Sequence, residues 1–232
     1  MPDNFVDLIV TSPPYDNLRS YNGYTFDFES IAKELFRVTK EGGVIVWIVQ
    51  DATIKGSKTG TSFKQVLYFK ELGFNLNDTM IWDKGSFTAV GSLTVRYGPS
   101  FEYMFILSKG KPKTFNPIKD RKNKHSGKTS KHIMKRQIDG TMKKENKKNY
   151  KIGEYGIRFN VWQFPKFSGR STHPAVFPKK LVIDHIISWS NEGDTIYDPF
   201  MGSGTTALAC KDTKRNYLGS EISKKYFEDF SL

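Results

Sequence analysis

A glycine-rich stretch near the C-terminal end of the chain has the form of a nucleotide-binding turn. Gly202-Ser203-Gly204-Thr205-Thr206-Ala207 fits the pattern G-x-G-x-x-A, after a short apolar segment and at the start of an expected helix. Glycines at these positions allow a tight turn and close approach of a ligand to the backbone. Glu221, at the end of the next expected strand, is placed to accept both hydroxyls of an adenosine ribose. These residues predict a nucleoside-cofactor site for NAD, FAD or S-adenosylmethionine.

A second chemical feature lies near the N-terminus, where Thr11-Ser12-Pro13-Pro14-Tyr15 follows the apolar run Val6–Val10. Ser12 offers a side-chain oxygen and Pro13 a carbonyl, and two such acceptors can hold one amino group. Proline brings no competing N–H and fixes φ, so the carbonyls are aimed in advance. Tyr15 offers a ring on which a base can stack. Because ligands bind at the carboxyl ends of strands in open α/β sheets, this position favours a functional string over an ordinary turn.

Both strings resemble motifs of one family, the DNA methyltransferases that modify exocyclic amino groups. Thr11–Tyr15 is similar to the catalytic motif, and Asp198-Pro199-Phe200-Met201-Gly202-Ser203-Gly204 to the S-adenosylmethionine-binding motif I. Gly219–Ile222 resembles motif II, and His173–Pro178 resembles motif X. The circularly permuted order, with the catalytic motif before a basic segment and the cofactor motif last, is similar to the β class. The resemblance implies catalytic roles for Ser12, Pro13, Pro14 and Tyr15, and S-adenosylmethionine contacts from Asp198, Pro199, Phe200, Gly202, Gly204, Thr205, Glu221 and Phe177.

The expected chemistry explains the catalytic string. An exocyclic amino nitrogen is a poor nucleophile because its lone pair is delocalised into the ring, and two acceptors on its N–H bonds favour a pyramidal nitrogen. The target base must leave the duplex by base flipping, which costs a few kcal/mol. The Ser-Pro-Pro-Tyr form is typical of enzymes that methylate N4 of cytosine, whereas N6-adenine enzymes usually have Asp-Pro-Pro-Tyr. We therefore favour N4 of cytosine, with N6 of adenine as the alternative.

The charge of the chain is concentrated in one internal segment. Of a formal net charge of +12, Lys109–Lys151 contributes 16 lysines or arginines against three acidic residues, which leaves the remainder nearly neutral. A basic block beside a neutral body is the electrostatic footprint of a polyanion-binding surface. The segment shows almost no periodicity, so we expect a loop or mobile insertion for target recognition on double-stranded DNA. The predicted DNA-binding residues are Lys122, Lys124, Lys128, Lys131, Lys135 and Arg136.

Strands that alternate with helices predict a Rossmann-like α/β methyltransferase fold with a mostly parallel, twisted sheet covered on both faces. Gly42-Gly43 has the composition of a helix C-cap. We expect the catalytic half at 1–108, the basic insertion at 109–160 and the cofactor half at 161–232. The expected strands are 6–10, 44–49, 76–82, 101–107, 195–197 and 217–219, and the expected helices are 28–39, 62–72, a helix opened by Pro178, 205–211 and 223–230.

Other classes of protein fit less well. No apolar run approaches the roughly 20 residues that span a membrane, and the N-terminus lacks the regions of a signal peptide. Cys210 is the single cysteine and the histidines have no metal-ligand spacing, so we expect no disulfide and no metal. A cytoplasmic location, at the nucleoid of a prokaryotic cell or phage-infected host, and a restriction-modification context with a partner endonuclease are consistent with this. Alternatives are a non-catalytic DNA-binding relative, a nicotinamide-dependent dehydrogenase, or methylation of RNA or protein glutamine.

One element of the family pattern is missing. Relatives usually carry a strand and helix before the stretch that matches Asp7–Tyr15, with a Gly-Asp pair that approaches the adenine of the cofactor. Here only a few residues precede that stretch. We therefore expect an unpaired sheet edge beside Asn216–Glu221, and the hypothesis is either that the start is truncated or that another chain or subunit fills the edge. The expected consequence is weak cofactor binding by the isolated chain or association through that edge.

Overall fold

The computed structural model describes residues 1–14, 26–87, 93–165 and 178–229. Tyr15 and Phe177, both predicted site residues, lie outside these ranges. The chain divides into two compact units: residues 1–116 with 160–232, and Pro117–Phe159. The second unit falls within the predicted insertion, whose boundaries at 109 and 160 stay a prediction.

The first unit is built on a seven-stranded sheet in the order β11-β5-β6-β2-β1-β12-β13. β6 is antiparallel to β5 and β2, and every other neighbouring pair is parallel, which confirms the mostly parallel α/β sheet. All strands except β6 therefore end at one side of the sheet, here called the carboxyl end. The strands are β1 (Val6–Thr11), β2 (Thr39–Val49), β5 (Phe74–Asp83), β6 (Phe101–Lys109), β11 (Val161–Gln163), β12 (Thr195–Asp198) and β13 (Asn216–Gly219).

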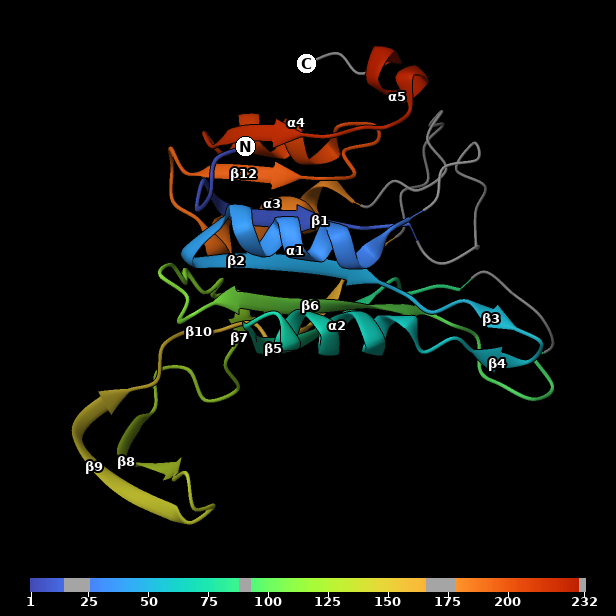
Figure 1. Ribbon diagram of the computed structural model, residues 1–232. Coiled ribbons are helices and arrows are strands. Elements are labelled where there is room, and N and C mark those ends of the chain that lie inside the picture. Colours follow the sequence, from blue (N-terminus) through green and yellow to red (C-terminus); the bar gives the residue numbers. More distant parts are fainter. Residues whose placement is uncertain (15–25, 88–92, 166–177, 230–232) are drawn as a thin grey trace. The chain divides into compact units, whose positions relative to one another are not determined.

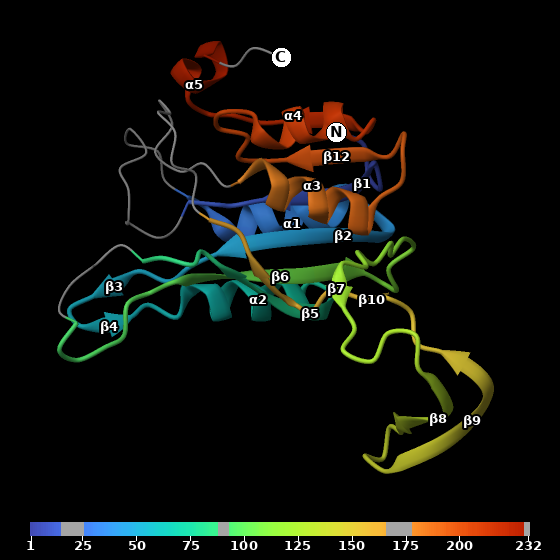
Figure 2. The ribbon, with the colours of Figure 1, turned by 180° about the vertical axis from the view of Figure 1, so that it is seen from behind.

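Helices cover both faces of this sheet. In Figure 1, α1 (Phe28–Val38) and α2 (Thr61–Glu71) lie over the near face, and Figure 2 shows α3 (Lys179–Trp189) over the opposite face. α4 (Thr205–Asp212) packs beside α3, and α5 (Lys224–Asp229) follows β13. The face that α3 turns to the sheet is mainly apolar. Its buried residues include Leu181, Val182, His185, Ile186 and Trp189.

The central strands form the hydrophobic core because they are nearly continuous apolar runs, as expected for strands covered on both faces. Trp47 of β2 and Phe69 of α2 are fully buried, with their rings 5.1 Å apart in an edge-to-face arrangement. Phe28 at the start of α1 packs on both rings. This aromatic cluster fixes α1 and α2 to β2, next to the strand that carries the predicted catalytic string.

The prediction that Gly42-Gly43 ends the first helix is wrong. α1 ends at Val38, Thr39 is already extended, and β2 runs through both glycines. The register of β2 on β1 shifts here, from Val6 opposite Thr39 to Leu8 opposite Val44, so the glycines form an irregularity within the strand. Gly42 has φ +78°, and a Cβ on Gly43 would lie 2.8 Å from the Lys40 carbonyl oxygen. Close backbone packing, rather than helix capping, explains the pair.

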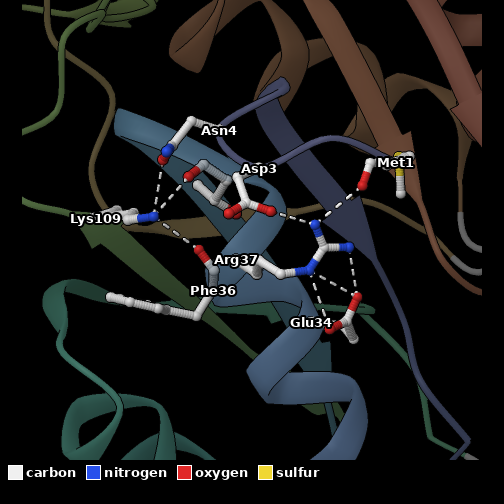
Figure 3. A network of polar contacts seen from close by, with 8 residues as sticks. Met1, Asp3, Asn4, Glu34, Phe36, Arg37 and Lys109 are labelled. Atoms are coloured by element: carbon white, nitrogen blue, oxygen red, sulfur yellow. Dashed lines mark hydrogen bonds and ion pairs between the residues drawn. The ribbon is translucent and has the colours of Figure 1, made fainter.

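Two cations secure the end of α1 and the first residues of the chain (Figure 3). The Arg37 guanidinium donates to Glu34, to Asp3 and to the Met1 carbonyl. The Lys109 ammonium donates to Asn4 Oδ1 at 2.9 Å and to the carbonyls of Phe36 and Thr39 at 2.9 and 3.1 Å. Lys109 opens the basic block in the sequence, but its charge is used to hold the fold. These contacts lie where β6 ends, opposite the carboxyl end of the other strands.

The second unit corrects the expectation of a loop at 109–151. β8 (Thr129–Arg136) and β9 (Met142–Lys151) form an antiparallel ribbon, and β7 (Arg121–Lys122) pairs with β10 (Tyr155–Gly156). The turn of the ribbon contains Asp139-Gly140, with Gly140 at φ +83° and the Asp139 carboxylate accepting from Thr141. Asp-Gly is a strong hairpin signal. The sequence did not predict these strands, because polar residues on both faces of the ribbon leave no alternation of apolar and polar residues.

Three short features complete the description. β3 (Thr53–Ile54) and β4 (Ser57–Lys58) form a small hairpin after β2. In the described part of the chain β13 pairs with β12 alone, so it forms the sheet edge where an unpaired strand was expected. No helix there is long and apolar enough to cross a membrane.

Candidate active site

Asp198 joins the two strings that the sequence singled out. It ends β12, and its carboxylate is almost fully buried, with 1% of the residue exposed. Oδ1 accepts from the Thr11 hydroxyl at 2.6 Å and from the Phe200 N–H at 3.0 Å, and Oδ2 accepts from the Thr206 hydroxyl at 2.7 Å. One carboxylate thus holds the end of the catalytic strand, the glycine-rich turn and the first turn of α4. Residues 187 positions apart are fixed within one hydrogen-bonded cluster.

The electrostatics of this cluster follow from burial. Burial raises the pKa of Asp198 above its ordinary value, while the hydrogen bonds from Thr11, Thr206 and Phe200 oppose the rise. Burial likewise raises the pKa of Tyr197, whose hydroxyl lies 2.9 Å from Ser220 Oγ. The Asp198 carboxylate has lost its contact with water, and three protein donors take the place of that water. Each of the three hydrogen bonds compensates part of the free-energy cost of burying the group.

The glycine-rich turn has the backbone that its sequence demands. Gly202 and Gly204 have φ values of +50° and +78°, a region that side chains with a Cβ disfavour. The Gly204 N–H donates to the Met201 carbonyl and closes the turn between β12 and α4, and the Met201 N–H donates to the Ser220 carbonyl, directly after β13. The buried Met201 side chain lies under β13, where a Cβ on Gly219 would be 2.1 Å from its Sδ. A side chain at position 219 would therefore force Met201 to move.

Glu221 lies directly over this turn. Its Oε2 accepts from the Gly202 N–H at 2.8 Å, and its Oε1 accepts from the Ser223 N–H at 2.8 Å. A carboxylate oxygen accepts more than one hydrogen bond, so this arrangement orients the group and leaves lone-pair directions for the hydroxyls of a ribose. The position agrees with the geometry expected for a nucleoside cofactor.

The predicted catalytic string begins where β1 ends. Ser12 and Pro14 are partly exposed and Pro13 is buried, directly after the Thr11 side chain that Asp198 holds. The structure therefore brings Ser12, Pro13 and Pro14 to the carboxyl end of the sheet, next to the strand that carries the glycine turn.

The remaining predicted cofactor residues flank the same turn. Pro199 and Phe200 are partly exposed, and the Phe200 ring packs edge-on against Phe26 at 5.5 Å and Trp47 at 6.4 Å. Phe200 thus ties the turn to the aromatic core under α1. Thr205 is the first residue of α4, after Gly204 in a left-handed conformation.

Sequence reasoning missed three charged residues at the carboxyl end. Asp51 follows β2, and its carboxylate accepts hydrogen bonds in the first turn of α2, from the Ser62 N–H at 2.8 Å and the Ser62 hydroxyl at 3.0 Å. Lys84 follows β5 and forms a 2.8 Å ion pair with Glu102 of β6. The signal was available, because each is a charged residue beside an apolar strand at the end where ligands bind.

The predicted DNA-binding residues lie in the second unit. Lys122 is in β7, Lys124 and Lys128 lie between β7 and β8, and Lys131, Lys135 and Arg136 are in β8. Apart from Lys131, whose side chain is not described, all of them are exposed.

Neither a metal site nor a reactive thiol is found in the described ranges. No group of three or more His, Cys, Asp or Glu side chains there could hold a metal ion. Cys210 is buried in α4, and burial raises the pKa of its thiol to about 12, so the thiolate is disfavoured at neutral pH.

A doubly covered, mostly parallel sheet with a glycine turn and a Ser-Pro-Pro string at its carboxyl end defines a Rossmann-like, S-adenosylmethionine-dependent methyltransferase. Comparison with known proteins agrees. The family model described as DNA methylase, for N6 and N4 methyltransferases, matches residues 6–231, and the chain belongs to this family. It is therefore a DNA amino-methyltransferase.

The chain is 57% identical to the orphan methyltransferase M.BamHII of Bacillus amyloliquefaciens, over 97% of this chain and 86% of that protein. It is 24% identical to the type II methyltransferase M.SmaI of Serratia marcescens, over 95% and 81%. Among solved structures, the cytosine-N4-specific PvuII DNA methyltransferase has a TM-score of 0.68 at 20% identity, over 97% and 78%. The M1.HpyAVI–SAM complex has a TM-score of 0.62 at 23% identity, over 97% and 87%.

The residues present fit S-adenosylmethionine. Glu221 lies 2.8 Å from the Gly202 amide and offers carboxylate oxygens over a turn with two left-handed glycines, which suits a ribose held close to backbone. When bound, the cofactor supplies the methyl group. Glu221 and the turn are the residues that would hold it.

Proposed function

We propose that this enzyme methylates N4 of cytosine in double-stranded DNA, with Ser12 and the Pro13 carbonyl as the two acceptors for the target amino group. The observation that carries the proposal is the 2.6 Å bond from Thr11 to Asp198. It fixes the residue before Ser12 to the carboxylate that also organises the glycine turn. The serine form of the string supports cytosine over adenine, and so does the fold shared with an enzyme titled cytosine-N4-specific.

In this mechanism the chain prepares the exocyclic amino nitrogen of the target base for attack on the methyl group. The Ser12 oxygen and the Pro13 carbonyl accept the two N–H bonds, so the nitrogen lone pair turns away from the ring and toward the methyl donor. Pro13 is buried and has no N–H, so no backbone donor at this residue competes with its carbonyl. Tyr15 is proposed to stack on the flipped base. Fixed acceptors at the reacting atom are worth more than mobile ones because they need no reorganisation during the reaction.

We further propose that the second unit binds the DNA. Residues 117–159 carry 14 lysines or arginines against four acidic residues. The register places Lys135 directly opposite Lys143, and like charges in that position destabilise a ribbon, although Glu145, 3.6 Å from Lys135, offsets part of the repulsion. A polyanion relieves this repulsion, and a two-stranded ribbon has the dimensions to enter the major groove.

The two faces of the ribbon carry different side chains, and we propose that one contacts phosphates and the other contacts bases. Because side chains alternate, Met134, Arg136, Met142 and Lys144 share one face, and Lys135 and Lys143 the other. Lys135 also lies 3.6 Å from Glu145. We assign phosphate contacts to the lysine face and to Lys122, Lys124, Lys128 and Lys131. The face with Arg136, which can donate bidentately to guanine, is assigned to the bases.

The decisive test combines base identity with a catalytic variant. DNA from cells that express the chain should contain N4-methylcytosine at one sequence, detected by modified-base sequencing. N6-methyladenine instead would refute the proposed base and would not affect the family assignment.

Ser12→Ala should lower methyl transfer by about 10²-fold or more, with little change in S-adenosylmethionine affinity. A loss of this size is typical when one fixed hydrogen-bonding group at a reacting centre is removed. Near-normal transfer by this variant would reject the role of Ser12.

We propose that the chain acts on DNA without an obligatory partner protein. The relative M.BamHII is named an orphan methyltransferase, which supports activity in the absence of a cognate endonuclease. A second copy pairing along β13 would complete the sheet edge, and light scattering of the purified protein with S-adenosylmethionine tests this association.

A further inference from the structure

The short β3–β4 hairpin contains a lysine in a disfavoured backbone conformation. Ile54 of β3 pairs with Ser57 of β4, which leaves Lys55 and Gly56 as a two-residue turn. Their φ values are +48° and +81°. A type I′ turn requires a positive φ at both central residues, and Asn-Gly, Asp-Gly and Gly-Gly are the usual pairs. Gly56 meets this requirement, whereas the Cβ of Lys55 makes the same conformation unfavourable at position 55.

Local contacts do not explain why a lysine stands at this position. The Lys55 side chain is exposed, and no hydrogen bond or ion pair joins it to another residue in the described part of the chain. Asparagine or glycine would form the same turn with less strain. A residue that keeps a strained backbone without a structural contact of its own is a candidate for function.

The hairpin is held in a defined place on the first unit. The Lys58 ammonium donates to the Asp51 carbonyl at 3.1 Å, which ties β4 back to the chain that leaves β2. The Arg96 guanidinium donates to the Gly56 carbonyl at 2.9 Å, at the turn itself. Because these two contacts fix the turn, the Lys55 side chain extends from a fixed base.

The surroundings of the turn are positively charged. Residues 52–64 contain Lys55, Lys58 and Lys64 and no acidic residue, and Arg96 adds a fourth cation at the turn. The first unit as a whole carries a formal charge of only +2, since residues 117–159 account for 14 − 4 = +10 of the total of +12. The hairpin is therefore a local positive region on a nearly neutral unit, which favours a polyanion as its ligand.

The hairpin also lies at the end of the sheet where the proposed acceptor site is. β1 and β2 are parallel, with Thr11 opposite Trp47, so both strands end on the same side. β3 begins four residues after β2 and lies beyond its arrowhead in Figure 1. Six residues separate Lys55 from the last residue of β2, a span of at most about 20 Å. A DNA duplex carries about 12 phosphate charges over that length, so a duplex bound at this end of the sheet offers many phosphates to the hairpin.

We propose that the β3–β4 hairpin is a phosphate-binding contact of the first unit, in which Lys55 donates to the DNA backbone with support from Lys58 and Arg96. The inference rests on the proposed function and adds a DNA contact outside the basic second unit. Phosphate contacts position a duplex without reading its sequence. Lys55 therefore increases the affinity for any duplex and takes no part in the choice of the target base.

The test compares Lys55→Asn with the matched control Lys214→Asn. Lys214, between α4 and β13, is also an exposed lysine with a positive φ, +58°, but it precedes β13 and so lies at the opposite end of the sheet. Its ammonium is 3.6 Å from Glu192 in an exposed ion pair. Each variant removes one positive charge and introduces a residue that tolerates the left-handed conformation. A difference between the two variants therefore reports on the place from which the charge was removed.

The Kd for a DNA duplex should respond to salt differently in the two variants. The log–log slope should become shallower by about 0.9 in Lys55→Asn, as for the loss of one phosphate contact, and should not change in Lys214→Asn. The ratio of Kd between Lys55→Asn and wild type should accordingly shrink about 3.5-fold between 50 and 200 mM salt. Lys55→Arg keeps the charge and should keep the wild-type slope. The urea midpoint of Lys55→Asn should equal or exceed that of wild type, because asparagine fits the turn better.

A wild-type slope in Lys55→Asn, or the same change of slope in Lys214→Asn, would overturn the proposal. Methyl transfer gives a second readout, in which Lys55→Asn should raise KM for DNA without lowering kcat and without changing the Kd for S-adenosylmethionine. A lower kcat with an unchanged KM would also overturn it. If the wild-type enzyme binds duplex DNA but methylates no base, the proposed function fails, and the slopes still decide the role of Lys55. Absence of duplex binding by the wild type would overturn the phosphate contact itself.

Discussion

Thr11→Val isolates the contact that links the catalytic strand to the cofactor turn. Valine has nearly the same shape as threonine but cannot donate, so Asp198 Oδ1 keeps only the Phe200 N–H. A hydrogen bond to a charged group contributes about 1.5–3 kcal/mol, which corresponds to roughly 10- to 100-fold in the unfolding equilibrium constant. The rate of methyl transfer, measured under conditions where the variant is fully folded, should also fall about tenfold. The reason is that Ser12 directly follows residue 11, which is no longer fixed to Asp198.

The effect should depend on pH in a defined direction. Burial raises the pKa of Asp198 above 3.8, and the bond from Thr11 opposes that rise, so Thr11→Val should raise the pKa further. A carboxyl group with a raised folded-state pKa stabilises the fold below its unfolded pKa, and this contribution is lost as pH rises through the folded value. The variant should therefore lose more stability relative to wild type at about pH 8 than at about pH 4. Urea denaturation at both pH values measures the difference.

Thr206→Val is the matched control. It removes the 2.7 Å bond to the other oxygen of the same carboxylate, but it acts on α4 and not on the catalytic strand. Both variants should lose similar stability, whereas Thr206→Val should weaken S-adenosylmethionine binding more than Thr11→Val does. Equal transfer rates for Thr11→Val and wild type, on folded protein at saturating cofactor, would refute the idea that this bond positions Ser12.

Three further changes test the rest of the site. Glu221→Ala should weaken S-adenosylmethionine binding measured by calorimetry, and unchanged affinity would move the ribose contact elsewhere. Gly219→Ala should displace Met201, since the new Cβ would lie 2.1 Å from its Sδ; overpacking of this kind costs about 1–3 kcal/mol, so cofactor affinity and the urea midpoint should both fall. Replacing the ribbon β8–β9 by a short glycine-serine linker should flatten the salt dependence of DNA binding, whose log–log slope is about −0.9 per phosphate contact; an unchanged slope would mean that the lysines only confer solubility.

The elements that position the site could be predicted from local chemistry. Val6–Thr11 is an apolar run followed by two prolines, and the glycines at 202 and 204 predicted a tight turn, in which both have positive φ values. Each follows from neighbouring residues alone, so the strand, the turn and their common end of the sheet were predictable. The Gly42-Gly43 pair shows where this approach fails, because the same glycines serve a helix cap or a strand irregularity according to what packs against them.

The sequence alone was enough to predict the chemistry of this enzyme, because the roles predicted for Ser12 and Glu221 rest on residue type and on place along the chain. Only the tertiary structure decided how the two halves are coupled. The bond from Thr11 to Asp198 spans 187 positions, and Lys84 meets Glu102 only because β5 and β6 are adjacent. Such contacts depend on strand order and register, which no local pattern specifies. The fold also turned a stretch of lysines without periodicity into an ordered ribbon, because backbone pairing between β8 and β9 does not require an apolar face.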